Sequence, residues 1–412
     1  MRKFGSLLIF LCIGGQTLFA EKPEEDWPQF RGVNRDGVAQ EQEILTEWPE
    51  EGLKLLWRKP LGSGFSSVAV FDGKLYTMFS EDSTEFVGSF DKDNGNELWR
   101  TEVGKLFINE FGNGPRATPT LDGKMLYAFG ANGDLVAVKR KNGKAVWRVS
   151  FPKDYGSTVQ TWAYSASPLI EENLLLIEAG APDGNAVLAL DKKNGKKIWA
   201  DYHGHHGYTS AMAHTFNGQR QFIFMPSKKI DQMSLVAYTP DGKLLWSHAV
   251  PGFNIASPLF FDDDKIFVSA SGNDDGGRVI QLIADGDSIK TKELWATRYM
   301  RNHFNTSIYY DGHLYGFSVA TLTCLDANTG ELKWRKRGLG KGSLVLVGDK
   351  FIVLGGKGKL ALIEASSDGY KELSSFQALT GKCWTAPTLV DGILYMRNLT
   401  EMAAFSIRKN QS

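Results

Sequence analysis

Short runs of Val, Leu, Ile, Phe and Tyr recur along the chain, and a polar turn interrupts each of them. In residues 67–76 two apolar runs flank Asp72-Gly73, and residues 118–127 repeat the arrangement around Asp122-Gly123. Asp-Gly favours a hairpin turn because glycine adopts positive φ without a steric penalty, and strands prefer the flanking residue types. No stretch of comparable length shows an apolar period of 3.6 residues. The pattern predicts an all-β fold.

A second repeated unit ends in tryptophan. It reads Asp-x-x-x-Gly-x-x-x-Trp at residues 91–99, 191–199 and 326–334, and residues 139–147 differ from it only at the first position. The positions that end the copies are Trp57, Trp99, Trp147, Trp199, Trp246, Trp295, Trp334 and, with Phe in place of Trp, Phe376. They are spaced 39 to 52 residues apart, which is the length of a four-stranded propeller blade. We expect these rings to pack between blades because a large aromatic side chain gains most from burial.

The two repeats are offset by one strand. Residues 53–60 contain the first tryptophan strand and precede every hairpin, whereas no tryptophan strand follows the last hairpin at residues 386–407. A ring in which residues 53–60 complete the last blade removes both open sheet edges. We therefore predict one domain at residues 53–412, an eight-bladed β-propeller of four-stranded antiparallel blades closed by its N-terminal strand.

The first 52 residues precede the predicted propeller. Arg2 and Lys3 are followed by an apolar stretch, and residues 1–20 resemble a signal peptide cleaved near Ala20. Cys12 is not preceded by the small residue that a lipoprotein signal needs. We expect an exported protein, periplasmic or extracellular, with no internal membrane span. Residues 21–52 form a lead-in, and we expect its aromatic side chains to pack against the ring.

Charge and cysteine content exclude several classes of protein. The 47 Lys and Arg residues balance 47 Asp and Glu residues, whereas a nucleic-acid-binding protein normally has a basic excess. After removal of the signal peptide only Cys324 and Cys383 remain. Two distant cysteines do not make a disulfide framework, so we expect buried free thiols.

The Asp-x-x-x-Gly-x-x-x-Trp unit with alternating hairpins, behind an export signal, resembles the PQQ-like propeller repeat. That superfamily includes quinoprotein alcohol dehydrogenases and BamB-type outer-membrane assembly proteins. Residues 27–32 (Trp-Pro-Gln-Phe-Arg-Gly), followed by Asp36-Gly37, also resemble the start of many exported members. The resemblance covers residues 27–407 and implies the propeller fold. It does not define the function of the protein, because the residues of the repeat serve to pack the blades together.

The resemblance implies two possible functions. In the dehydrogenases PQQ and calcium lie beside a vicinal Cys-Cys pair, but Cys324 and Cys383 are 59 positions apart, and no set of calcium ligands matches. In the BamB-type proteins a lipid anchor holds a scaffold in an assembly machine, but the lipobox is missing here. Both functions remain hypotheses at this stage.

Polar and aromatic residues gather in the segments that connect each tryptophan strand to the next hairpin. In a propeller these segments meet at the central channel, where they can form a pocket with stacking walls, and a cationic bias favours an anionic or heavily hydroxylated ligand. The candidate ligand-binding residues are Arg116, Trp162, Tyr164, His205, His206, Asn254, Arg301, His303, Lys341 and Trp384.

Residues 203–206 (His-Gly-His-His) are the densest cluster of candidate ligands. His203 and His205 would share one face of an extended segment, but their spacing matches no established zinc pattern. We therefore predict no metal site and leave the catalytic residues unassigned. The sequence also contains no Gly-x-Ser-x-Gly elbow, phosphate-binding loop or Cys-x-x-Cys pair.

Three functions fit these features. The leading hypothesis is a non-catalytic binding or scaffold protein of the cell envelope, which binds a protein partner or a small polar, anionic or glycan ligand through its loops. The second is a PQQ-dependent dehydrogenase of alcohols or sugars, with Trp162 or Trp384 as the stacking surface. The third is a carbohydrate-binding propeller that uses the same aromatic residues.

Overall fold

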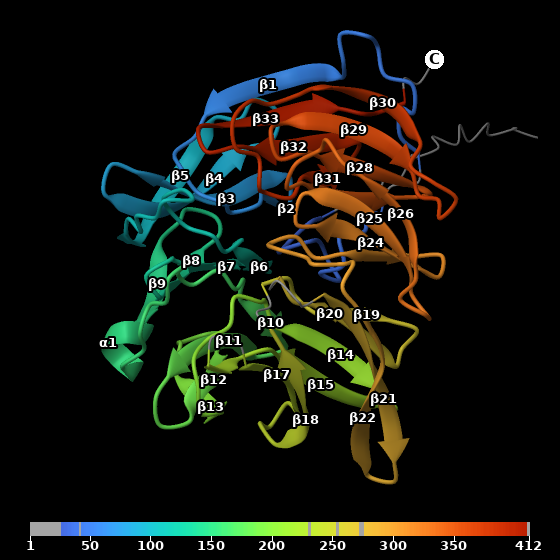
Figure 1. Cartoon of the computed structure of the whole chain (residues 1–412). Coiled ribbons are helices and arrows are strands. Elements are labelled where there is room, and N and C mark those ends of the chain that lie inside the picture. Colours follow the sequence, from blue (N-terminus) through green and yellow to red (C-terminus); the bar gives the residue numbers. More distant parts are fainter. Residues whose placement is uncertain (1–25, 41–42, 230–231, 253–254, 272–275, 410–412) are drawn as a thin grey trace, which may run out of the picture.

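Eight antiparallel β-sheets surround a central axis in the computed structural model of the chain, shown in Figure 1. The structure describes residues 26–40, 43–229, 232–252, 255–271 and 276–409. Within these residues one short helix, α1 (Phe151–Tyr155), accompanies the strands. The predicted all-β, eight-bladed propeller is confirmed. The predicted signal peptide at residues 1–20 lies outside the described residues.

The blades are numbered in chain order, and each runs from its innermost strand outward. Blade 1 contains β2 (Ala69–Phe71), β3 (Lys74–Glu81), β4 (Thr84–Asp91) and β5 (Glu97–Lys105), and blade 2 contains β6 (Thr120–Asp122), β7 (Met125–Phe129), β8 (Asp134–Lys139) and β9 (Ala145–Ser150). Blade 3 contains β10 (Leu169–Glu171), β11 (Leu174–Ala181), β12 (Asn185–Asp191) and β13 (Lys197–Asp201). Blade 4 contains β14 (Met212–Phe216), β15 (Gln219–Phe224), β16 (Ser227–Lys229), β17 (Gln232–Tyr238) and β18 (Leu244–Pro251).

Blade 5 contains β19 (Leu259–Phe261), β20 (Lys265–Ser269), β21 (Gly277–Asp285) and β22 (Ser288–Thr297), and blade 6 contains β23 (Ile308–Tyr310), β24 (His313–Ser318), β25 (Thr321–Asp326) and β26 (Leu332–Lys336). Blade 7 contains β27 (Ser343–Val347), β28 (Lys350–Leu354), β29 (Lys359–Glu364) and β30 (Glu372–Gln377). Blade 8 contains β31 (Thr388–Val390), β32 (Ile393–Arg397), β33 (Glu401–Ser406) and β1 (Lys54–Pro60). Blade 4 departs from the four-stranded pattern, because the short β16 also pairs with β17.

Strand β1 closes the ring, as the offset between the repeats predicts. It pairs antiparallel with β33, from Lys54 opposite Ser406 to Pro60 opposite Glu401. Arg397, fully buried at the end of β32, reinforces the junction with blade 1. Its guanidinium donates to the carbonyl oxygens of Met78 (2.7 Å) and Gly62 (2.9 Å). The first and last segments of the propeller therefore share one blade.

Each repeated tryptophan packs against the next blade, which confirms the predicted interblade packing. The indole N–H of Trp99, in blade 1, donates to the carbonyl oxygen of Arg140 in blade 2 at 3.1 Å. The same ring covers Gly143, where a Cβ would lie 2.5 Å from a ring carbon. Indole–carbonyl bonds of the same kind join Trp57, Trp147, Trp199, Trp295 and Trp334 to the blade that follows each of them.

Blade 4 again departs from the pattern. The indole N–H of Trp246 donates to the side-chain oxygen of Gln221 in its own blade, at 2.6 Å. The facing blade 5 has a hairpin around Gly286 in place of the Asp-x-x-x-Gly turn, and nothing lies within 4 Å of the Cβ position of that glycine. The tryptophan therefore has no glycine of the next blade to cover.

Hydroxyl side chains link the blades around the channel. At the start of an innermost strand, a backbone N–H donates to the hydroxyl oxygen of the corresponding residue in the next blade. The bonds run from Ser67 to Thr118 (3.1 Å), Thr118 to Ser167 (2.9 Å), Ser167 to Ser210 (2.9 Å), Ser210 to Ser257 (3.0 Å) and Ser257 to Thr306 (3.1 Å). These bonds fix the positions of the loops that immediately precede them.

No helix within the described residues has the length and apolar character needed to cross a membrane.

Candidate functional site

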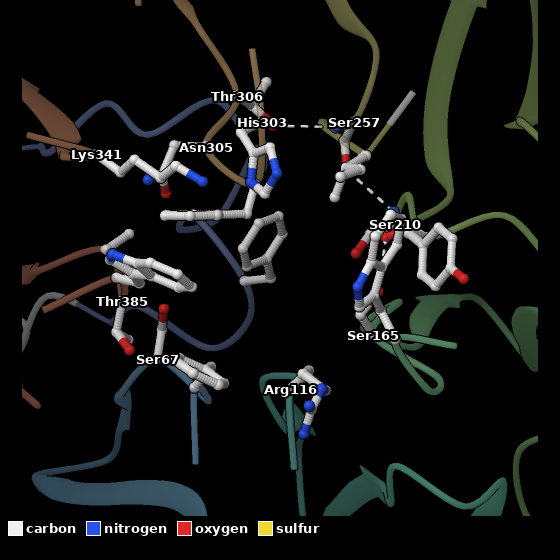
Figure 2. Close-up of a pocket in the computed structure, with 18 of the residues that line it drawn as sticks. Ser67, Arg116, Ser165, Ser210, Ser257, His303, Asn305, Thr306, Lys341 and Thr385 are labelled. Atoms are coloured by element: carbon white, nitrogen blue, oxygen red, sulfur yellow. Dashed lines mark hydrogen bonds between the residues drawn. The ribbon is translucent and has the colours of Figure 1, made fainter. Parts of the chain in front are cut away.

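A cavity of about 250 Å³ lies at the mouth of the channel, where the loops between blades meet (Figure 2). Its lining residues come from all eight connections between successive blades, and one more comes from the lead-in. They are Phe30, Phe65, Ser67, Asn109, Phe111, Arg116, Trp162, Ser165, Tyr208, Ser210, Ile255, Ser257, His303, Phe304, Asn305, Thr306, Lys341, Trp384, Thr385 and Ala386. Apolar atoms form most of the wall's surface, as is usual for a small-molecule site, although eleven of the twenty lining residues carry a polar or charged side chain.

Aromatic side chains form two groups in the wall. Trp384 stacks on Phe304, with 4.9 Å between ring centroids, and on Phe65, with 5.9 Å between centroids. Trp162 contacts Tyr208 at 5.5 Å with the rings tilted by 57°. Because Trp384 already stacks on two phenyl rings, it acts as a packed wall rather than as a free stacking face.

The cavity carries positive charge. Arg116 and Lys341 both line it, and no Asp or Glu does so among the described residues. Burial lowers the pKa of Arg116 to about 10, an effect that the negative charge of Glu85 opposes. Burial, followed by the positive charge of Lys382, also lowers the pKa of Lys341. An anion in the cavity would interact with cations in an environment that water screens weakly.

Arg116 also organises the loop that carries it. Its guanidinium donates to the carbonyl oxygen of Gly112 (3.0 Å) and to that of Gly114, and it lies over the ring of Phe107 at 4.7 Å. On the opposite side, the ammonium of Lys341 lies 5.2 Å from the ring centre of Trp384. The two cations thus approach the cavity from well-packed positions, as Figure 2 shows.

His303 faces the cavity across from Arg116 (Figure 2). Burial and the nearby charge of Lys341 lower its pKa to about 4, so the imidazole is neutral at pH 7. Its Nδ1 is buried and, within the described part of the chain, has no hydrogen-bond partner. The ring therefore offers a polar atom that a ligand can satisfy.

The structure brings together five of the ten sequence-predicted site residues: Arg116, Trp162, His303, Lys341 and Trp384. Tyr164 and His206 instead stack on each other behind the wall, with 4.0 Å between ring centroids. Burial lowers the pKa of His206 to about 4, and its Nδ1 contacts the carbonyl oxygen of Gly207 at 2.8 Å. Both side chains are buried in the ring and do not line the cavity.

Three other predicted residues do not line the cavity as the structure describes it. His205 is exposed and pairs through its backbone with Ser227, by N–H to O distances of 2.7 and 3.0 Å. The backbone N–H of Arg301 donates to the hydroxyl of Ser318, and its side chain is absent from the lining. Asn254 lies outside the described residues. The described lining of the cavity thus includes neither His205 nor Arg301.

Sequence reasoning missed the phenyl rings of the site. Phe65, Phe111 and Phe304 lie in the connecting loops between blades, as the predicted polar residues do. Their position in these loops was the one feature of the sequence that could have identified them as cavity residues. Phe30 belongs to the lead-in, and no feature of the repeat links that segment to the channel.

The residues present do not fit a pair of PQQ and calcium. The aromatic walls and the two cations suit an aromatic polycarboxylate, but Ca²⁺ needs carboxylate and carbonyl oxygen ligands, and the described lining supplies no carboxylate. No group of three or more His, Cys, Asp or Glu side chains able to hold a metal occurs in the part of the chain described. Cys324 and Cys383 are both buried free thiols.

Comparison with known proteins identifies the fold. Residues 83–254 match the family model described as outer membrane protein assembly factor BamB. BamB from Moraxella catarrhalis superimposes with a TM-score of 0.59 and 13% identity, over 86% of this chain and 99% of that one. No curated protein sequence matches significantly.

Other solved structures share the architecture. A europium-containing methanol dehydrogenase has a TM-score of 0.66 at 11% identity, over 94% of this chain and 98% of that one. The computationally designed Ika8 protein has a TM-score of 0.55 at 12% identity, over 86% of this chain and all of that one. The chain thus shares its fold with proteins that range from an enzyme to a designed protein, so the fold alone does not define its function.

Proposed function

We propose that this chain is an exported, non-catalytic binding protein of the cell envelope, and that the cavity at the channel mouth holds an organic anion with an apolar body. The observation that carries the proposal is the convergence of Arg116 and Lys341 on aromatic walls, with no acidic side chain among the described lining residues. The match of residues 83–254 to the BamB model supports a binding role in the envelope.

A paired titration tests this function. Purified protein is titrated with 8-anilinonaphthalene-1-sulfonate, and separately with N-phenyl-1-naphthylamine, which has the same rings but no sulfonate. We expect saturable, one-to-one binding of the sulfonate. Lys341→Met should weaken it about tenfold, which corresponds to about 1.4 kcal/mol, and should leave binding of the uncharged analogue unchanged.

Lys144→Met provides the matched control, because Lys144 is exposed in a turn between outer strands. Arg116→Lys retains the charge but loses the planar donor geometry that fixes the loop, so we expect an intermediate loss. Equal affinity for the charged and uncharged probes, or a sulfonate affinity that Lys341→Met does not change, would refute the proposal.

Two sources can supply the anion, a free small molecule or a protein partner, and cross-linking in cells separates them. Phe111 is 42% exposed at the rim of the cavity, so a photoreactive amino acid placed there should capture a partner that reaches the site. If a protein supplies the anion, Lys341→Met should abolish that cross-link; if the ligand is a free small molecule, no such cross-link should depend on Lys341.

A quinone-dependent dehydrogenase is the second candidate, favoured by the structural likeness to the methanol dehydrogenase. It predicts that PQQ with calcium quenches tryptophan fluorescence, raises the melting temperature and supports dye reduction with an alcohol or a sugar. We place it second because the described lining offers no carboxylate for the calcium ion.

A further inference from the structure

Phe30 lines the cavity although it belongs to the lead-in and not to any blade. We propose that residues 27–39 of the lead-in form the floor of the binding site, and that Phe30 sets how deep a ligand can enter. The inference rests on the proposed function, because it describes the selectivity of the same cavity. It also assigns a role to the Trp-Pro-Gln-Phe-Arg-Gly segment, which the propeller repeat does not explain.

The backbone of the lead-in is hydrogen-bonded to the innermost strands inside the ring. Trp27 exchanges two bonds with Val70 of blade 1, at 2.8 and 2.9 Å, and the carbonyl oxygen of Pro28 accepts from Leu121 of blade 2 at 2.8 Å. On the other side, Ala39 donates to Leu346 of blade 7 at 2.8 Å. Figure 1 shows this dark blue segment within the ring.

Two buried arginines hold the turn that carries Phe30. Arg31 donates to the carbonyl oxygens of Thr306 and Ser307 in blade 6, both at 3.0 Å. Arg35 donates to the carbonyl oxygen of Ala211 in blade 4 at 3.0 Å and to that of Pro168 in blade 3. Together with the backbone contacts, these bonds connect residues 27–39 to six of the eight blades.

The conformation of the turn depends on these contacts. Arg31 and Arg35 have φ of 62° and 59°, a left-handed conformation that costs a residue with a side chain about 1–2 kcal/mol. Gly37 has φ of 79°, and a Cβ there would lie 2.8 Å from the guanidinium of Arg31. The strained turn persists because the carbonyl bonds from the ring fix both arginines.

The lead-in lies below the cavity along the channel. In blades 1 and 3 the residue that lines the cavity comes before the residue that holds the lead-in, on the way into or along the innermost strand: Ser67 precedes Val70 and Ser165 precedes Pro168. The loops that form the mouth come earlier still in the chain. A ligand entering from the mouth therefore meets the hydroxyl ring first and the phenyl ring of Phe30 last.

Selectivity for ligand length tests the role of Phe30. Competition against 8-anilinonaphthalene-1-sulfonate ranks benzoate, biphenyl-4-carboxylate and p-terphenyl-4-carboxylate, which share one charge and differ in length. We expect the native protein to discriminate against terphenyl, and Phe30→Ala to improve its relative affinity about tenfold. Val33→Ala, in the same turn but 51% exposed, should leave the ranking unchanged. An unchanged ranking in Phe30→Ala, with the probe still bound, would overturn the inference.

A second measurement needs no ligand. The thiol of Phe30→Cys is labelled with an anionic and with a cationic methanethiosulfonate of similar size, and Val33→Cys serves as the exposed control. A floor beneath Arg116 and Lys341 should favour the anionic reagent at least tenfold relative to the control, and Lys341→Met should reduce the preference. If the ratio of anionic to cationic labelling were the same at positions 30 and 33, the inference that the lead-in forms the floor would be refuted, even if the sulfonate probe binds. The expected labelling without probe binding would refute the proposed function alone.

Discussion

Glu178 illustrates how a single buried carboxyl can connect two blades. It lies in β11 of blade 3 and is 1% exposed. Its oxygens accept hydrogen bonds from the backbone N–H groups of Gly207 (2.6 Å) and Met225 (2.8 Å) in the segments leading into and within blade 4. Burial raises the pKa of Glu178 to about 7, although these two hydrogen bonds act in the opposite direction.

The raised pKa of Glu178 predicts a pH-dependent stability. Between about pH 4.5 and pH 7 Glu178 binds its proton more tightly in the folded state than in the unfolded state, so its contribution to the free energy of unfolding should fall as the pH rises through that range, whereas His206 and His303, whose pKa values burial lowers, contribute in the opposite direction. Each full pKa unit corresponds to about 1.4 kcal/mol, so a decrease of about 1–3 kcal/mol is expected. Urea unfolding at pH 5 and pH 8 measures it.

Glu178→Gln removes the titrating group and should flatten this part of the profile. Glu172→Gln, at an exposed position in the same blade, should leave the profile of the native protein intact. If the difference in stability between the native protein and Glu178→Gln were the same at pH 5 and pH 8, the proposed titration of Glu178 would be wrong.

Individual site residues were only partly predictable, and Trp162 and Tyr164 show why. Both were candidates because they lie in the same connecting segment, and in an extended segment residues two apart would share a face. Ala163 between them has φ of 64°, which turns the chain and sends Tyr164 into the core, where its hydroxyl donates to the carbonyl oxygen of Ala179 at 2.8 Å. A left-handed alanine has no signature in the sequence, so side-chain direction in these loops could not be derived.

At the scale of the structural element, the contact between a tryptophan and a turn glycine is the recurrent unit of the fold. Its sequence signal is strong because most copies carry, four residues apart, a glycine that the tryptophan of the preceding blade covers and a tryptophan that packs against the following blade, and this made the blades predictable. The exceptions were less predictable. The extra strand β16 in blade 4 contains only three residues, Ser227–Lys229, which is too short for a recognisable apolar pattern.

The tryptophan–glycine contact predicts a specific sensitivity to added atoms. In Gly143→Ala the new Cβ would meet the ring of Trp99 at 2.5 Å, at a φ of 71°. Overpacking costs about 1–3 kcal/mol and the left-handed conformation about 1–2 kcal/mol, so a loss of about 2–5 kcal/mol is expected. The denaturant concentration at the unfolding midpoint reports this loss.

Gly123 provides the matched control. It also has positive φ, 53°, but nothing lies within 4 Å of its Cβ position. Gly123→Ala should therefore show the backbone cost alone. Equal losses at Gly123 and Gly143 would mean that contact with the tryptophan contributes nothing beyond backbone strain.

At the scale of the whole molecule, ring closure was predictable and the floor of the cavity was not. Closure followed from counting strands, because one tryptophan strand had no hairpin before it and one hairpin had no tryptophan strand after it. Residues 27–39 of the lead-in, in contrast, contact six blades through hydrogen bonds between residues far apart along the chain, such as Ala39 and Leu346, which are separated by 307 positions. No local pattern encodes such contacts.

Closure predicts where the molecule should weaken when β1 is removed. Deletion of residues 53–60 leaves blade 8 with three strands and exposes β33, while it removes Trp57 from the turn of blade 1. Hydrogen exchange should therefore accelerate in β31–β33 and in β2–β5, the two blades beside the seam. The β14–β18 sheet, on the opposite side of the ring in Figure 1, should retain its protection.

A synthetic peptide of residues 53–60 added to the deleted protein should restore protection at the seam, because the open edge of β33 keeps the register that pairs Lys59 with Met402. The same peptide with Trp57→Ala should restore protection in blade 8 but not in blade 1, since it can pair with β33 but cannot donate to the carbonyl oxygen of Lys92. Two separate effects would show that one strand completes a blade through its backbone and joins two blades through its indole. Uniform loss of protection around the ring would instead mean that the propeller unfolds as one cooperative unit and that closure has no local contribution.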